Sequence, residues 1–179
     1  LYLEGPGDQA ILRSWARRFS RPLERAIDES SVLMGGRQPA RAKKHFRQQR
    51  SQEPAARGVC VLDRDDAEEP LGEPEPGLEF FTWPRRHIES YLLVASAIRR
   101  HTRNTSEIDE IERILGCSDL DPVDTHAKNL LSPRGALARE LGHPVSAAGV
   151  ARAMRREEIH EDVHTLFDRI YTNANLRAP

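Results

Sequence analysis

Acidic side chains follow three short hydrophobic segments in the first half of this sequence. Glu4 and Asp8 follow the first segment, Asp63 and Asp65 the second, and Glu89 the third. If these segments are parallel strands, their carboxyl ends lie at one edge of a sheet, where ligands bind. Carboxylates that meet there need a cation among them, and oxygen-rich sites suit Mg²⁺ or Mn²⁺. The pattern therefore predicts a metal site built from residues far apart in the chain.

The spacing of Asp63 and Asp65 has a geometric meaning. In an extended segment, residues i and i+2 point the same way, so both carboxylates can share one cation. Alone, an Asp-x-Asp pattern is weak evidence, because acidic turns after strands are common. Glu89 also has a purely structural explanation, since the helix dipole favours acids in a first turn. The prediction depends on the combination of these residues with Glu4.

The hydrophobic pattern predicts strands and helices in alternation, followed by helices alone. Strands are expected at 1–3, 31–34, 58–62 and 79–83. Helices are expected at 8–19, 40–49, 87–101, 106–115, 124–141 with a break at Pro133, and 146–171. We therefore expect an α/β fold with a doubly wound, mostly parallel sheet over residues 1–100. A helical region would follow over 101–179, with a last helix that can pack back on the core.

Two of the acidic motifs resemble a known domain. The residues Glu-Gly-Pro-Gly-Asp at 4–8 and Leu-Asp-Arg-Asp at 62–65 resemble the Toprim domain of primases, topoisomerases, recombination proteins and nucleases. Asp rather than Gly at position 8 is similar to the nuclease branch. The run Trp-Pro-Arg-Arg-His-Ile-Glu-Ser-Tyr-Leu-Leu at 83–93 resembles the OLD (overcoming lysogenization defect) nucleases. The resemblance covers residues 1–93 and is much weaker over the helical remainder.

The resemblance implies a Toprim fold and hydrolysis of phosphodiester bonds in DNA. Two Mg²⁺ or Mn²⁺ ions about 4 Å apart would be held by Glu4, Asp8, Asp63, Asp65 and Glu89. Glu4 would also be the catalytic acid/base. Nucleases of this type use a lysine near the leaving group, and Lys128 is the candidate here. The implied catalytic residues are thus Glu4, Asp63, Asp65 and Lys128, and an ABC-type ATPase domain would precede this chain.

Composition limits the classes of protein that fit. A formal net charge of −1 argues against a simple basic nucleic-acid binder. Basic clusters at 17–25, 41–50, 85–86 and 152–156 would hold the DNA backbone without reading its sequence. No apolar run approaches the roughly 20 residues of a membrane span. Two cysteines form neither a disulfide framework nor a metal pair, which favours a reducing, cytoplasmic setting. A homodimer is left open.

Three alternatives remain from the sequence. The Toprim core is also compatible with a primase or topoisomerase, although a topoisomerase needs a nucleophilic tyrosine in another domain. A module that binds metal and nucleic acid without catalysis is the second alternative. The third is a zinc peptidase, because His160-Glu161-Asp162-Val163-His164 matches the H-E-x-x-H pattern. That motif lacks a Gly or His at the spacing of its extended form, so a zinc peptidase is disfavoured.

Overall fold

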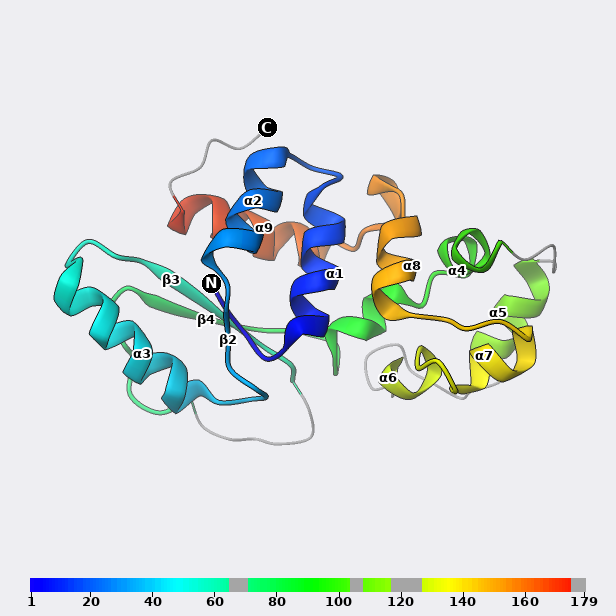
Figure 1. Ribbon diagram of the computed structural model, residues 1–179, viewed down its shortest axis with the longest axis horizontal. Helices are drawn as coiled ribbons and strands as arrows, with labels where there is room; N and C mark the ends of the chain where they lie inside the picture. The colour runs from blue at the N-terminus through cyan, green and yellow to red at the C-terminus, as the bar shows by residue number, and fades with distance from the viewer. Residues whose placement is uncertain (65–70, 104–107, 117–126, 175–179) are drawn as a thin grey trace.

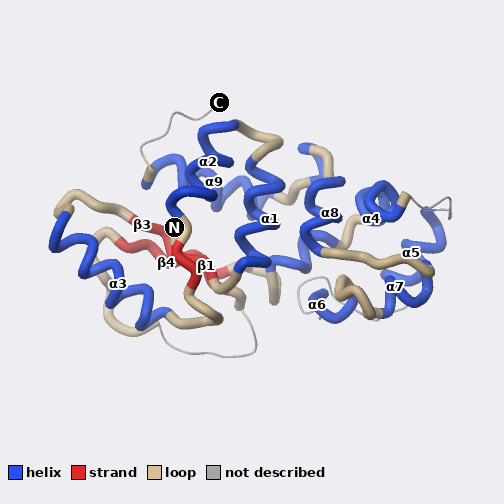
Figure 2. Tube along the Cα trace, viewed as in Figure 1, coloured by secondary structure: helices blue, strands red, loops and turns tan. Residues whose placement is uncertain are grey.

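A four-stranded parallel sheet forms the centre of the fold (Figures 1 and 2). The computed structural model describes residues 1–64, 71–103, 108–116 and 127–174. Its strands are β1 (Tyr2–Leu3), β2 (Val32–Leu33), β3 (Gly58–Leu62) and β4 (Leu78–Thr82), in the spatial order β2-β1-β3-β4. Every pairing between these strands is parallel. The predicted α/β class with a parallel sheet is confirmed.

Helices cover both faces of the sheet (Figure 2). On one face lie α1 (Pro6–Ala16), α2 (Arg21–Ser30) and α9 (Glu161–Asn173); on the other lies α3 (Pro39–Gln52). All five residues of β3 are buried, as expected for a strand that is covered on both sides. Alternate residues of the sheet therefore contribute to two separate hydrophobic clusters. One cluster contains Leu3, Val59, Val61 and Phe81, and the other contains Tyr2, Cys60, Leu62 and Leu78.

The strand order reverses beside β1. From β1 the chain passes through α1 and α2 to β2, and then through α3 to β3, on the opposite side of β1. In a doubly wound sheet the crevice for ligands lies at such a reversal, outside the carboxyl ends of the two strands. Glu4 directly follows β1 and Asp63 directly follows β3. The topology thus brings Glu4 and Asp63 to the same edge of the sheet.

The first predicted helix ends earlier than expected, and a helix that was not predicted follows it. Pro6 occupies the first turn of α1, where its missing N–H costs nothing, and the helix ends at Ala16 rather than at 19. The sequence analysis did not predict α2. Its N-cap is Ser20, whose hydroxyl accepts a hydrogen bond from the Leu23 amide, and Pro22 lies in its first turn. Proline is compatible with the first turn of a helix but disrupts a helix interior, so Pro22 did not indicate that a helix begins there.

The prediction of one helix over 87–101 is wrong. The chain forms a 3₁₀ turn, η1 (Ile88–Leu92), and then the separate helix α4 (Ala95–Thr102). Ser90, Tyr91 and Leu92 are all buried, although they are consecutive. Consecutive residues cannot share one face of an amphipathic α-helix, because side chains three and four apart are the ones that do. Burial of this segment on several sides therefore favours the tighter turn.

The later helices differ from the prediction where the structure describes them. The described residues form α5 (Ile108–Gly116), α6 (Ala127–Leu130), α7 (Ala136–Leu141), α8 (Ala147–Ala153) and the 3₁₀ turn η2 (Arg156–Glu158) before α9. The predicted break near Pro133 is present between α6 and α7, whereas the continuous helix over 146–171 is wrong. Met154 and Ile159 have extended backbones, because each turns a buried side chain into the core between helices. No helix in the described ranges is long and apolar enough to cross a membrane.

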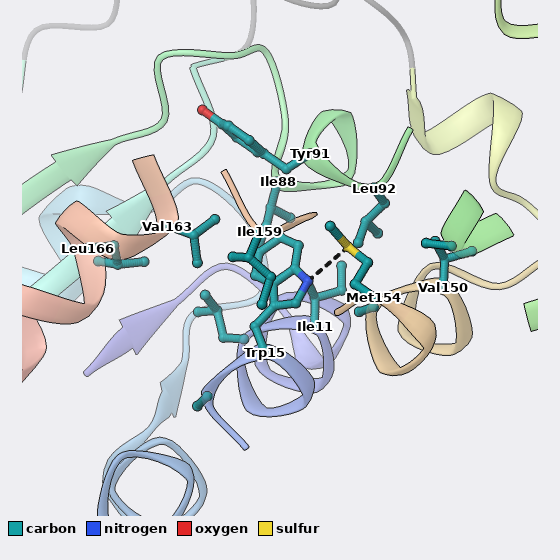
Figure 3. Packing of buried hydrophobic residues seen from close by; sticks show 14 of the residues in the cluster. Ile11, Trp15, Ile88, Tyr91, Leu92, Val150, Met154, Ile159, Val163 and Leu166 are labelled. Atoms are coloured by element: carbon teal, nitrogen blue, oxygen red, sulfur yellow. Dashed lines mark hydrogen bonds between the residues drawn. The ribbon is translucent and has the colours of Figure 1, made fainter. Parts of the chain in front are cut away.

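The core continues from the sheet into these helices (Figure 3). The indole N–H of Trp15 on α1 donates to the sulfur of Met154, 3.2 Å away, and Val150 and Val163 belong to the same cluster. Arg169 on α9 forms an ion pair with Glu79 on β4. The last helix therefore lies on the sheet, and α8 packs on α1. A division into units at residue 100 stays a prediction.

Candidate functional site

Glu4 connects the carboxyl ends of β1 and β3. Its Oε1 atom accepts a hydrogen bond from the backbone N–H of Asp63, at 2.8 Å. Its carbonyl oxygen accepts hydrogen bonds from Gly35 and Gly36, which follow β2. Both glycines have positive φ angles, 78° and 116°, a region that side-chain-bearing residues rarely adopt. The Gly-Gly turn thus fixes Glu4 from one side while β3 fixes it from the other.

Asp63 is the buried centre of the site, with 2% of its surface exposed. Its Oδ1 atom accepts the backbone N–H of Ile88 at 3.0 Å, and its Oδ2 atom lies 2.6 Å from Nζ of Lys128. The Nδ1 atom of His87 lies 3.5 Å from Oδ2. The segments around residues 63, 87 and 128, which are remote in sequence, therefore meet at the carboxylate of Asp63. A buried carboxylate with such partners is held in a single orientation.

Asp8 joins the site from the first turn of α1. Its Oδ2 atom accepts the N–H of Gly5 at 2.6 Å, which caps the helix and directs the carboxylate toward the end of β1. Burial and the nearby charge of Asp63 raise the pKa of Asp8, although the Gly5 N–H and Lys128 oppose that rise. A raised pKa in a helix's first turn runs against the macrodipole, which favours ionised acids there. Burial of the carboxyl group is therefore the main cause, and the charge of Asp63 is the second.

The pKa of Glu89 is raised as well. Burial raises its pKa to about 7, and the charges of Asp63 and Asp8 add to that rise, while Lys128 opposes it. Within the described residues, its buried Oε2 atom has no hydrogen-bond partner. Buried polar atoms are nearly always paired, so an orphaned carboxylate oxygen marks a place suited to a proton or a cation.

Lys128 is placed by α6, which packs against η1. Its ammonium bonds to Asp63 and lowers the pKa of both Asp8 and Glu89, so one cation acts on three carboxylates. Its side chain is nevertheless 45% exposed. The turn after α6 depends on Gly135, since a Cβ there would lie 2.2 Å from the carbonyl oxygen of Asn129. Lys128 therefore combines a fixed backbone with a head group that solvent or substrate can reach.

The predicted metal ligands are only partly gathered. Glu4, Asp8, Asp63 and Glu89 share the site, whereas Asp65 lies outside the described residues. Among the residues that are described, no three His, Cys, Asp or Glu side chains are arranged to hold one ion. Lys128 instead lies at Asp63 Oδ2. The orphaned oxygen of Glu89 and the raised pKa values nevertheless fit a divalent cation, because a second positive charge would relieve both.

Two residues of the site were not predicted. The side chain of Arg37 donates to the carbonyl oxygen of Asp63, and the buried His87 lies beside the same residue. Arg37 follows the Gly35-Gly36 turn, and His87 lies inside the run that resembles OLD nucleases, two residues before Glu89. The sequence contained a signal for His87, but none that distinguished Arg37 from the other arginines.

Part of one predicted basic cluster has a structural role. Lys43 on α3 is buried and donates to the carbonyl oxygens of Leu71 and Glu73, and Arg47 pairs with Glu75. These residues hold the segment that precedes β4 against α3. Lys43 is therefore not available to bind DNA as the sequence analysis expected of the whole cluster, whereas Arg47 and Lys44 on the same helix are exposed.

The H-E-x-x-H motif does not form a zinc pair. His160 is the N-cap of α9 rather than a residue within it, and its Nδ1 atom accepts the N–H of Asp162. Its ring lies beside Tyr91, whereas the ring of His164 packs edge-on against Phe19. The two histidines therefore serve different contacts, which argues against a zinc peptidase.

Comparison with protein-family models, with curated proteins and with solved structures found no match to this chain. The resemblance to Toprim and OLD nucleases thus rests on the motifs alone. What the geometry adds is a buried carboxylate cluster at the reversal of a parallel sheet, with one reachable lysine.

Proposed function

We propose that this chain is a metal-dependent DNA endonuclease domain of the Toprim type, similar to the OLD nucleases. One observation carries the proposal: the orphaned Oε2 atom of Glu89 in a cluster of carboxylates whose pKa values are raised by burial and mutual repulsion. Such clusters are found where a cation or a proton has a function. Their position at the reversal of the strand order supports the same conclusion.

The residues divide into holding and reacting groups. Asp63, Asp8, Glu89 and Glu4 would hold two Mg²⁺ or Mn²⁺ ions, and Asp65 would join them. Bound metal supplies an activated water and neutralises charge on the scissile phosphate. Glu89 Oε2 can retain a proton near pH 7, since its pKa is about 7. Lys128, which is partly exposed, can turn its Nζ atom from Asp63 to a phosphate oxygen and stabilise negative charge there.

Several partners belong to the same proposal. The substrate is DNA, bound through its backbone, and an N-terminal ABC-type ATPase domain would act with this one. A homodimer is compatible with it. A cytoplasmic location stays a prediction from the two cysteines.

Plasmid cleavage by this protein tests the proposal. Supercoiled plasmid is expected to be nicked with Mg²⁺ or Mn²⁺, and not with EDTA, because the ions complete the carboxylate site. Ca²⁺ is expected to bind without supporting cleavage, since its looser coordination positions the reactants less closely. The measurement is the rate of conversion from supercoiled to nicked DNA on a gel. Equal rates in EDTA and Mg²⁺ would exclude a metal-dependent enzyme.

Replacing Lys128 by Ala separates catalysis from metal binding. Cleavage is expected to fall about a hundredfold, as when one donor to a transition-state oxyanion is removed. Affinity for Mn²⁺, measured by calorimetry, is expected to stay or rise, because the ammonium competes with the ion for Asp63 Oδ2. Arg57→Ala is the control, because Arg57 is an exposed cation at the amino end of β3, outside the predicted basic clusters, and should change neither quantity. A loss of Mn²⁺ affinity in Lys128→Ala would contradict the assigned role.

The direct ion pair between Asp63 and Lys128 favours one alternative. A carboxylate that already has a cationic partner suits a module that binds nucleic acid without cleaving it. Binding of Mn²⁺ with no cleavage under any of the tested ions would support that module over the nuclease.

A further inference from the structure

A pocket of about 260 Å³ lies between α1, α2 and α8, outside the carboxylate site. Its walls carry arginines from segments far apart in the sequence. The lining residues are Ala10, Arg13, Ser14, Arg17, Glu24, Ala148 and Arg152. The fold thus joins two of the basic clusters, those near residues 17 and 152, around one cavity.

The arginines of this pocket differ in whether they have an acidic partner. Arg13 forms ion pairs with Asp28 at 3.0 Å and with Glu24 at 3.8 Å, so the acids of the pocket already have a partner. Arg17 and Arg152 are exposed, and the described part of the chain gives neither of them an ion pair. Together with burial, the charge of Arg152 lowers the pKa of His101 on α4. Two uncompensated guanidinium groups therefore face an open cavity.

The walls of the pocket are held in place. The guanidinium of Arg18 donates to the carbonyl oxygen of Arg152 at 2.6 Å, which ties the end of α1 to the end of α8. The Trp15–Met154 contact fixes the same two helices from the core side (Figure 3). A cavity between rigid helices, lined by the forked donors of arginine, suits the tetrahedral oxygens of a phosphate.

We propose that this pocket binds a phosphate of the nucleic acid backbone, with Arg17 and Arg152 as its cationic partners. The inference rests on the proposed function for the identity of its ligand. Arg17, the C-cap of α1, lies nine positions after Asp8, a rise of about 14 Å along the helix axis. At about 3.4 Å per nucleotide of a strand, the pocket would hold a phosphate roughly four nucleotides from the bond at the carboxylate site.

Binding measurements test the pocket without requiring cleavage. The probe is a fluorescein-labelled 20-base-pair duplex in EDTA, followed by anisotropy between about 50 and 200 mM salt. Arg17→Ala and Arg152→Ala are each expected to weaken binding several-fold. The double variant should lower the slope of log K against log salt by about 0.9, the value expected for loss of the one phosphate contact that both arginines share. Arg57→Ala, on an exposed residue at the amino end of β3 and outside the basic clusters, is the control and should change affinity less than twofold.

A variant that is expected to tighten DNA binding completes the test. Glu24→Gln removes the negative charge of the pocket and is expected to tighten DNA binding, whereas Glu29→Gln, on the same helix but outside the pocket, is not. The inference would be overturned if Arg57→Ala weakened DNA binding as much as the pocket variants do, or if the double variant kept the native salt slope. The inference would also be overturned if the pocket variants lost the thermal stabilisation that inorganic phosphate provides but kept the native affinity for DNA. If these dependences appear in a protein that cleaves nothing, the pocket stands and the nuclease proposal fails.

Discussion

Asp63→Asn is expected to reduce metal-dependent DNA cleavage about a thousandfold or more. Asp63 is the residue on which β3, η1 and α6 converge, through Ile88 N–H and Lys128 Nζ. Asparagine keeps the size of the side chain and the acceptor for Ile88, so the fold should persist. It removes the charge that would hold a cation and that keeps Lys128 in place. The measurements are the plasmid nicking rate and the affinity for Mn²⁺ by calorimetry, both of which should fall.

Asp168→Asn is the matched control for this loss of charge. Asp168 is an exposed acid on α9, and its replacement should leave both measurements unchanged. A second consequence follows from the electrostatics, since the charge of Asp63 raises the pKa of Asp8 and of Glu89. Without it, the pKa of Asp8 should fall, because Asp63 affects that group more than Lys128 does, and NMR titration of the Asp8 carboxyl can follow the change. Cleavage by Asp63→Asn within tenfold of the native rate would remove this residue from the catalytic site.

The strands of this fold are local features, and the sequence predicts them well. Residues 58–62 form β3 at the predicted bounds, because a continuous apolar run between polar segments suits a strand covered on both sides. Since strand ends share an edge, the convergence of Glu4 with Asp63 also follows from the pattern. The helices were harder to predict. In η1 three consecutive residues are buried by tertiary contacts, and the chain forms a 3₁₀ turn although its hydrophobic residues have helical spacing. The spacing alone therefore predicted an α-helix.

The remaining parts of the site depend on long-range packing. Lys128 follows residues 117–126, which lie outside the described part of the chain, and its contact with Asp63 depends on α6 packing against η1. The family resemblance suggested this lysine; no local pattern did. Arg37 bonds to a backbone carbonyl, a contact available to an arginine anywhere along the chain. The sequence therefore predicts which carboxylates can meet, but not which cations accompany them.

Glu89→Gln is expected to stabilise the metal-free protein at pH 8 and to weaken its cleavage of DNA. Folding raises the pKa of Glu89 to about 7, mainly because the carboxylate is buried and also because Asp63 and Asp8 repel its charge. The ionised group therefore costs folding free energy. That cost is absent at a pH below the unfolded pKa near 4.5, grows as the pH rises toward 7, and is complete above it.

The size of the effect follows from the rise of the pKa from 4.5 to about 7, and is on the order of 3 kcal/mol at pH 8. Glutamine has no charge at any of these pH values, so the variant should melt about 6–12 °C above the native protein at pH 8. At pH 5, which lies between the unfolded and the folded pKa, the difference should shrink to about 2–3 °C. Thermal melts at both pH values in EDTA are the measurement, with the exposed Glu140→Gln as the matched control.

Metal should reverse the order of stability. Adding Mn²⁺ at pH 8 is expected to stabilise the native protein strongly and Glu89→Gln weakly, because the variant lacks the oxygen whose charge the ion would neutralise. Cleavage by the variant should fall about a hundredfold or more for the same reason. A carboxylate that destabilises the metal-free protein yet is required for metal binding is what a catalytic site needs and a structural ion pair does not. An equal gain in melting temperature at pH 5 and pH 8 would instead assign Glu89 to packing alone.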